Sequence, residues 1–212
     1  MEALLRQHIV AVGRRLYARS LVAATDGNVS ARLEDEQLLV TPAGSCLGEL
    51  EPNDLLCLAP AAESDPALPH ARPTSELAMH RCAYAQRPDV AAIVHAHLPH
   101  ATAITVAGLS LEAPVLPELV VMLGTVPTAP YATPSTAEGA RAIEALIGTH
   151  DAILLDRHGA LAVGTSVWDA YRKLEKLEHA AQVVLAARAA GRVRTLSPAQ
   201  VARLEALKAQ GA

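Results

Sequence analysis

The chain has almost no large aromatic side chains. Its 212 residues include no phenylalanine, one tryptophan and four tyrosines, yet hydrophobic residues make up 51% of it, mainly alanine, leucine and valine. That hydrophobic fraction is enough for a sizeable core, so we expect many small side chains to fill the core in place of a few large rings. The length is short for two domains, and we expect a single compact domain over residues 1–212.

Other absences exclude whole classes of protein. The three cysteines, Cys46, Cys57 and Cys82, show no Cys-x-x-Cys spacing, which argues against a disulfide framework and a cysteine zinc site. The net charge is −4, and residues of both signs are scattered along the chain. We therefore expect neither a basic stripe that binds nucleic acid nor a basic surface that binds a membrane. No apolar run reaches the ~18 residues of a membrane span, and the N-terminal segment reads as a helix, not a signal peptide. We therefore expect a reduced cytoplasmic protein without nucleic-acid or membrane partners.

Periodicity and turn residues predict helices and short strands that are mixed along the chain. Helices are expected at residues 3–19, 73–88, 98–108, 135–148 and 166–191, with a last short helix from Ser197-Pro198, and strands at 24–33, 36–44, 54–60, 90–96, 124–131 and, as a hairpin, 152–164. Several strands follow one another through hairpins. This order predicts an α/β fold in which helices cover a mixed or antiparallel sheet.

Cap residues mark the starts of three of these helices. Thr74 or Ser75 can cap the helix that ends before Pro88. Ser135 with Glu138 has the spacing of a capping box. The long helix 166–191 opens on a serine and ends at a glycine.

Two histidines, His95 and His97, stand two residues apart at the end of the apolar stretch 90–96. On a strand, residues i and i+2 point to the same face, so both imidazoles converge on one side while Ala96 points to the opposite layer. A catalytic zinc site uses three protein ligands and one open position. The spacing alone is weak evidence, because a pair of ordinary polar residues at a strand end looks the same.

A third ligand has to come from elsewhere in the chain. His158 lies in the predicted hairpin turn just before a glycine, where it either projects into a cleft or is an ordinary polar turn residue. His100 is close enough in sequence to compete, but its spacing from His97 is less regular. His80 is interpreted as a half-buried residue with satisfied hydrogen bonds.

The segment that opens the helix after residue 73 also carries candidate chemistry. Glu76 falls in the first helical turn, where an acid either complements the helix dipole or acts as a general acid/base beside a metal. Thr74 and Ser75 either cap the helix or, with the free N–H groups there, cradle an anion. The turns at 26–30 and 41–44 are either plain turns or offer backbone N–H groups to phosphate.

Six segments, in this order, resemble the class II sugar-phosphate aldolase and adducin-head superfamily, and most of all its L-fuculose-1-phosphate aldolases: GNVSAR, TPAG, PTSE, HAH, APYAT and DRHGALAVG. The resemblance covers nearly the whole chain, and the ordered combination is specific although each segment is not. It implies a three-layer α/β/α fold with a central mixed, largely antiparallel sheet. It also implies a homotetramer with active sites at subunit interfaces.

The resemblance implies a zinc-dependent lyase that cleaves a ketose phosphate to dihydroxyacetone phosphate and an aldehyde. One zinc per subunit, or another divalent transition metal, would bind His95, His97 and His158, and Glu76 would move the substrate proton. The implied phosphate-binding positions are Thr25, Asn28, Gly44, Thr74 and Ser75. Zinc would act as a Lewis acid that stabilises an enediolate, while the bound phosphate fixes the substrate's orientation.

Two departures from the aldolase pattern leave the substrate open. Ala43 stands where the aldolases have a hydroxyl residue. Where they have a tyrosine after the His-x-His strand, this chain offers Glu118, either a distal proton donor or an acid that favours a helix start. Epimerisation, decarboxylation or dehydration of a related sugar phosphate are alternatives. A non-catalytic module like the adducin head is a further alternative, against which the retained histidines and Glu76 argue.

Overall fold

The computed structural model describes residues 1–209, so the end of the predicted domain 1–212 lies outside the described residues. The helices are α1 (Glu2–Ala18), α2 (Leu77–Gln86), α3 (Pro99–Val106), α4 (Pro117–Met122), α5 (Ala137–Ile147), α6 (Val167–Ala190) and α7 (Pro198–Ala209), and a 3-10 turn η1 spans Pro52–Asp54. The strands are β1 (Asn28–Arg32), β2 (Leu38–Val40), β3 (Leu56–Leu58), β4 (Ala92–Ala96), β5 (Thr128–Ala129), β6 (Ala152–Leu155) and β7 (Gly159–Gly164). Within residues 1–209, no helix combines the length and the apolar character that crossing a membrane requires.

The strands form one sheet in the order β3-β2-β1-β4-β7-β6-β5. Strand β5 is parallel to β6, and the other described pairs are antiparallel. The β6–β7 pair is the hairpin predicted at residues 152–164. The predicted α/β fold with a mixed, largely antiparallel sheet is confirmed, and β4 lies at its centre.

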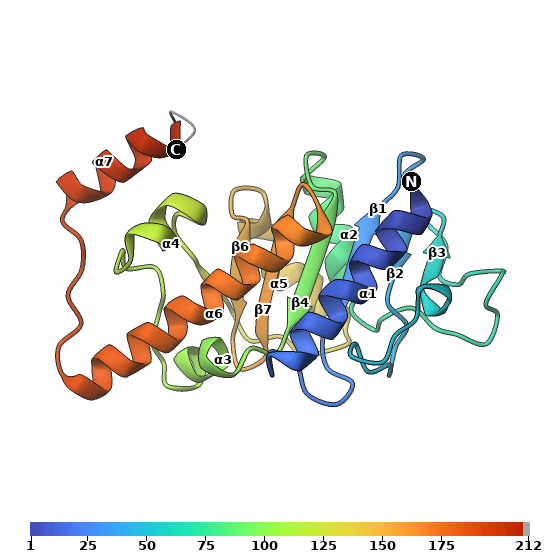
Figure 1. Cartoon of the computed structure of the whole chain (residues 1–212), viewed down its shortest axis with the longest axis horizontal. Coiled ribbons are helices and arrows are strands. Elements are labelled where there is room, and N and C mark those ends of the chain that lie inside the picture. Colours follow the sequence, from blue (N-terminus) through green and yellow to red (C-terminus); the bar gives the residue numbers. More distant parts are fainter. Residues whose placement is uncertain (210–212) are drawn as a thin grey trace.

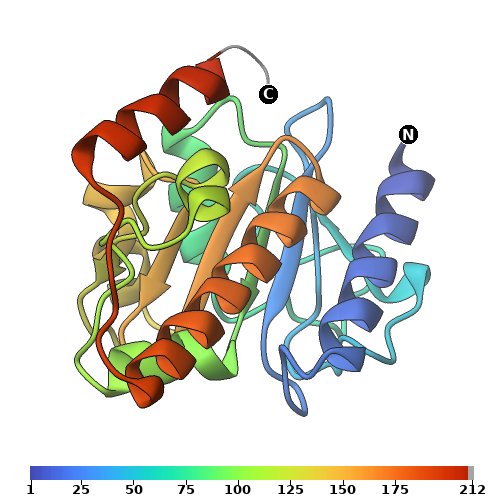
Figure 2. The same cartoon turned by 60° about the vertical axis from the view of Figure 1, so that its left-hand side comes forward.

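Helices cover both faces of the sheet and make three layers. Helices α1 and α6 lie in front of the strands in Figure 1, with α3 beside α6, whereas α2 and α5 lie behind them. The terminal helix α7 lies against α4 (Figure 2), and the backbone N–H of Leu196 donates to the carbonyl of Pro114 at 2.7 Å. This last helix was predicted to be short, and it has 12 residues.

The side chains of β4 alternate between two cores. Ala92, Val94 and Ala96 pack in the core beneath α1 and α6, while Ile93 packs in the core beneath α2 and α5. Ala160 and Ala162 of β7 extend the first core. Small side chains at these positions let the long helix α6 lie close to the sheet, as expected for a core with so few rings.

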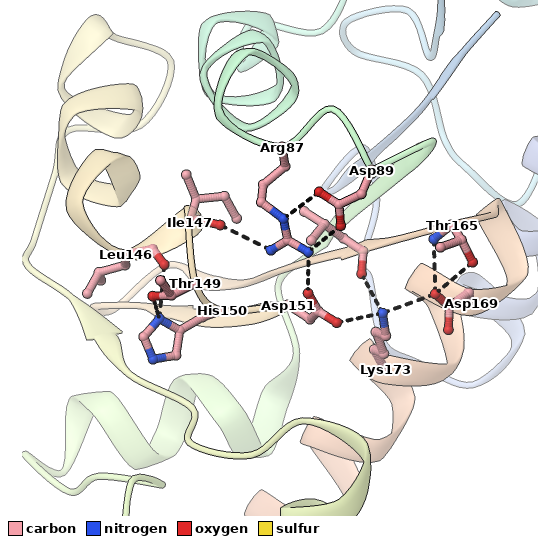
Figure 3. A network of polar contacts seen from close by, with 11 residues as sticks. Arg87, Asp89, Leu146, Ile147, Thr149, His150, Asp151, Thr165, Asp169 and Lys173 are labelled. Atoms are coloured by element: carbon pink, nitrogen blue, oxygen red, sulfur yellow. Dashed lines mark hydrogen bonds and ion pairs between the residues drawn. The ribbon is translucent and has the colours of Figure 1, made fainter. Parts of the chain in front are cut away.

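A charged network joins the ends of several elements at the end of the sheet where β4 begins and β7 ends (Figure 3). Arg87, just after α2, donates to Asp89 and Asp151 at 2.7 and 2.8 Å. Lys173 of α6 lies 2.8 Å from Asp151 and 3.0 Å from Asp169. Asp151, just before β6, therefore links the helices on the two faces of the sheet.

Two of the predicted helix starts are displaced by one or two residues. Ser135 does not form the predicted capping box, because its φ of +62° is incompatible with a cap. Thr136 caps α5 instead by accepting the backbone N–H of Glu138. Helix α2 begins after Glu76, which takes the cap position itself without a capping side-chain bond, and Thr74 accepts the N–H of Glu76. The cap and the glycine end predicted for α6 are confirmed.

Candidate metal centre

Four side chains that could hold a metal ion meet where β4 ends. Glu76, His95, His97 and His158 each offer one ligand atom, and these atoms lie within 4.8 Å of one another. The three imidazole rings are 4.6 to 5.0 Å apart between centroids. The structure therefore brings together the three predicted ligands and the predicted acid/base from β4, the β6–β7 turn and the start of α2.

Two glycines allow other segments to approach this end of β4. At Gly27, with φ +77°, a Cβ atom would lie 2.9 Å from the carbonyl oxygen of His95. At Gly159, with φ +152°, a Cβ atom would lie 3.0 Å from the Cα of His97. Glycine adopts such angles without strain, so the turn before β1 and the turn that carries His158 can press against β4.

The orientation of His95 leaves one ring nitrogen facing the cluster. Its ring is fully buried, and Nδ1 lies 2.9 Å from the carbonyl oxygen of Ala160. A carbonyl only accepts, so Nδ1 carries the hydrogen and donates it. Nε2 has no hydrogen-bond partner among the described residues and lies 3.0 Å from Oε2 of Glu76. A buried nitrogen that is held in place through its other side is typical of a metal ligand.

Burial and the neighbouring charges set the protonation of the other imidazoles. Burial and the positive charge of His95 lower the pKa of His158 to about 4. The same two causes lower the pKa of His97. Both rings are therefore neutral at pH 7 and can offer a lone pair to a cation.

Glu76 and His95 favour a positive charge between them. Burial raises the pKa of Glu76, but His95, His158 and the amide of Asn28 outweigh burial and lower it below its ordinary value. Burial lowers the pKa of His95, but the negative charge of Glu76 outweighs burial and raises it. A proton or a metal ion can supply this positive charge.

The donor set of the cluster fits a divalent transition metal. Three imidazoles and one carboxylate are ligands that suit zinc. His97 also has an outer partner, since its Nδ1 lies 3.3 Å from Oδ2 of Asp26. His100 is not part of the cluster: its Nδ1 and backbone N–H both contact Glu178 of α6.

A polar cavity of about 250 Å³ opens beside the cluster. Its lining includes Glu76, His97, His158 and all five predicted phosphate-binding residues, Thr25, Asn28, Gly44, Thr74 and Ser75. Backbone bonds between residues 41–43 and 72–74 bring the last three of these together. No lysine or arginine is among the described residues that line it.

Asn28 has a second contact that the sequence does not indicate. Its Nδ2 donates to Oε2 of Glu76 at 2.9 Å. The Asn28 carboxamide is therefore a partner of the acid/base as well as a predicted phosphate contact.

Glu118 lies apart from this cavity. It is exposed in the first turn of α4 and lines neither this cavity nor the adjoining hollow at residues 130–136. Within the described chain, its distance from the cluster fits the alternative of an acid at a helix start.

Ser135 is a cavity residue that the sequence interpretation missed. Its hydroxyl lies 2.8 Å from that of Ser75, and both residues line the cavity. A non-glycine residue at φ +62° costs of order 1 kcal/mol and tends to occur at functional sites. The local sequence gave no sign of this, because a serine there matched a capping box.

Comparisons with known proteins show which family the chain resembles. The family model for the class II aldolase and adducin N-terminal domain matches residues 7–185. A 3-oxo-tetronate 4-phosphate decarboxylase of Escherichia coli K12 is 32% identical over 188 residues, 87% of each chain. An L-fuculose phosphate aldolase of Methanococcus vannielii is 34% identical over 168 residues, 79% of this chain and 88% of that protein.

A solved structure extends the likeness over almost the whole fold. The structure of YgbL from Klebsiella pneumoniae, described as a putative aldolase/epimerase/decarboxylase, superposes with a TM-score of 0.87 at 32% identity. The match covers 96% of this chain and 99% of that one. The three-layer arrangement thus belongs to a shared architecture.

Proposed function

The chain belongs to the family of class II aldolase and adducin N-terminal domains, and on this premise we propose that it is a metal-dependent lyase that decarboxylates a four-carbon 3-oxo sugar-acid phosphate. The meeting of three imidazoles and Glu76 beside a polar cavity carries this proposal. Decarboxylase relatives support it, and aldolase relatives at similar identity make cleavage of a ketose 1-phosphate the second candidate.

The two candidate reactions share one intermediate. In decarboxylation of 3-oxo-tetronate 4-phosphate, the C1–C2 bond breaks, carbon dioxide leaves, and the electron pair passes to the oxygen on C3. Protonation at C2 then gives dihydroxyacetone phosphate. In retro-aldol cleavage of a ketose 1-phosphate, an aldehyde leaves and the same enediolate remains. A divalent cation in the cluster would supply a Lewis acid for the negative charge that develops on the substrate oxygens.

Glu76 would move the proton in this reaction. Its side chain lines both the polar cavity and the adjoining hollow, next to the imidazoles. A general acid/base has to lie within hydrogen-bond reach of the reacting carbon. A substrate bound in the cavity with its oxygens toward the histidines meets this condition.

The number of protons to be moved favours decarboxylation. Carbon dioxide leaves without a proton transfer, so the reaction needs one proton at C2. Glu76, which its lowered pKa leaves ionised, would take that proton from solvent and deliver it to C2. Aldol cleavage also requires that the hydroxyl of the departing aldehyde lose its proton. Glu118, the predicted residue for that second transfer, does not line the cavity.

The phosphate of the substrate would be held without a fixed positive charge. Thr25, Thr74, Ser75 and the turn at Gly44 line the cavity. Hydroxyl and backbone N–H donors orient a phosphate and so place the reacting carbons. Assembly into a homotetramer stays a prediction, and a sedimentation measurement that gives a monomer would contradict it.

The decisive assay measures the product in which the two reactions differ, carbon dioxide or an aldehyde. Dihydroxyacetone phosphate forms in both reactions, so zinc-loaded protein should be tested for carbon dioxide from the 3-oxo acid phosphate and for aldehyde from ketose 1-phosphates. His95→Ala protein provides the background, because 3-oxo acids also decarboxylate spontaneously.

We expect equal amounts of carbon dioxide and dihydroxyacetone phosphate, with a higher kcat/KM than for any ketose 1-phosphate. The opposite ranking would establish the aldolase instead. If neither substrate yields dihydroxyacetone phosphate above the background, both candidates are refuted.

A further inference from the structure

A chain of buried side chains runs from Glu76 into the core between β1 and α2. Asn28 and Ser30 stand two residues apart on β1, and His80 and Tyr84 stand four apart on α2, so each pair shares a face. All four are buried, and His80 and Ser30 are completely so. In this series of side chains, only the contact from Asn28 to Glu76 reaches the candidate metal centre.

The hydrogen-bond contacts between these buried side chains are short. Nε2 of His80 lies 2.6 Å from Oδ1 of Asn28, and its Nδ1 lies 2.7 Å from Oγ of Ser30. Oγ of Ser30 lies 2.8 Å from the hydroxyl of Tyr84. Both ring nitrogens of His80 therefore have a partner, unlike those of His95.

The direction of every bond follows from the carboxylate at one end. The amide group of Asn28 donates to Glu76, so its oxygen faces His80 and accepts. Nε2 of His80 must then carry the hydrogen. Burial lowers the pKa of His80 to about 3, so the ring is neutral and Nδ1 accepts the hydroxyl hydrogen of Ser30. Tyr84 is left to donate to Ser30.

We propose that His80 is a positioning residue for Glu76: as the Nε2–H tautomer it holds the Asn28 carboxamide with its amide group toward the carboxylate. An amide free to turn over would present its oxygen to Glu76 and repel it. The geometry of Glu76 is thus set by His80, four residues further along in α2, and by Asn28, 48 residues away in the sequence. The consequence for turnover rests on the proposed function, whereas the tautomer does not.

The first test reads the tautomer in the unmodified, zinc-loaded chain. Long-range proton–nitrogen NMR spectra of ¹⁵N-histidine-labelled protein distinguish the Nε2–H ring from the Nδ1–H ring and from imidazolium. The signals missing from His80→Gln protein identify the residue. At pH 7 we expect Nε2–H with a bare Nδ1. Either of the other two forms would overturn the proposal, whatever the enzyme's substrate.

The second test separates positioning from stability. Glutamine can place an amide near the position of Nε2, so His80→Gln keeps the donor to Asn28, while His80→Leu removes it. We expect kcat to fall about 10- to 100-fold in the leucine variant, with zinc content and KM nearly unchanged, and to recover most of the way in the glutamine variant.

Asp65→Ala is the matched control. Asp65 is buried and accepts the backbone N–H groups of Cys57 and Ala67, away from the cavity, so its loss destabilises the chain without touching the Glu76 contacts. The proposal is overturned if Asp65→Ala lowers kcat as much as His80→Leu, or if His80→Leu turns over normally. Should His80→Leu fail to fold, the NMR result on the unmodified chain still decides.

Discussion

Replacing Glu76 with glutamine should abolish proton exchange at dihydroxyacetone phosphate while the metal stays bound. Dihydroxyacetone phosphate is the common product of both candidate reactions, and its hydroxymethyl carbon is the one that the enediolate protonates. Incubated with the enzyme in deuterium oxide, it should exchange one hydrogen at that carbon. The assay therefore tests Glu76 without depending on which substrate is the natural one.

The structure indicates that this substitution is local. Glutamine keeps the length of the side chain, and its oxygen can still accept the Asn28 amide, which now lies 2.9 Å from Oε2. The three imidazoles are unchanged, so a zinc site with three protein ligands remains. What disappears is the group that takes and gives the proton, and such a loss lowers rates by about 10²- to 10⁴-fold.

Exchange is followed by proton NMR, and zinc is measured in the same samples by elemental analysis. Glu112→Gln is the control, because Glu112 is an exposed acid that lines neither hollow. Exchange by Glu76→Gln protein within tenfold of the unmodified rate, with zinc bound, would refute the role given to Glu76.

Three further results are expected. His95→Ala should lower zinc affinity, measured by competition with a chelating dye, by more than about a hundredfold, since even an outer partner of a ligand is worth 10- to 100-fold; unchanged affinity would place the metal elsewhere. Ser135→Gly should raise the melting temperature, because a φ of +62° no longer strains the backbone. The same variant should raise KM for the phosphorylated substrate about five- to tenfold, because the hydroxyl beside Ser75 is lost. Ser135→Ala should raise KM without raising the melting temperature. Lys173→Met should lower the free energy of unfolding at pH 7 by about 1–3 kcal/mol, because it leaves Asp151 short of a partner. Burial raises the pKa of Asp151, but Lys173 and Arg87 outweigh burial and lower it. The stabilisation by the Lys173–Asp151 pair is therefore present above about pH 4 and is lost as the pH falls through the pKa of Asp151 in the folded state. Urea titrations should show a smaller difference in unfolding free energy between the two proteins at pH 3 than at pH 7.

Most of the fold follows from local patterns in the sequence. The alternation at β4 predicted that Ala96 faces away from the side on which His95 points, and the two separate cores show this. The turn between β6 and β7 predicted the hairpin that carries His158. These features depend on residues a few positions apart, which is the range that periodicity and turn chemistry describe.

The details that were missed depend on contacts between distant segments. Glu76 is the cap residue of α2 and lies outside its first turn, and its carboxylate contacts Asn28 and two imidazoles. Ser135 takes a strained angle beside Ser75, 60 residues away, and so cannot serve as a cap. No local spacing contains these pairings, since they form only when β1, α2 and the 130–136 loop are assembled.

The groups that meet at the cavity also bear on whether the chain catalyses decarboxylation or aldol cleavage. The proposed decarboxylation needs the cluster, the cavity and one group that passes a proton from solvent to C2, and the described chain offers a candidate for each from its own elements. Aldol cleavage needs a second group to take the hydroxyl proton of the departing aldehyde, and Glu118 on α4 lies outside both hollows of its own chain. In the predicted homotetramer, Glu118 would meet the substrate across a subunit contact. The proposed decarboxylation therefore uses groups that lie together in one chain, whereas aldol cleavage through Glu118 would depend on the predicted assembly.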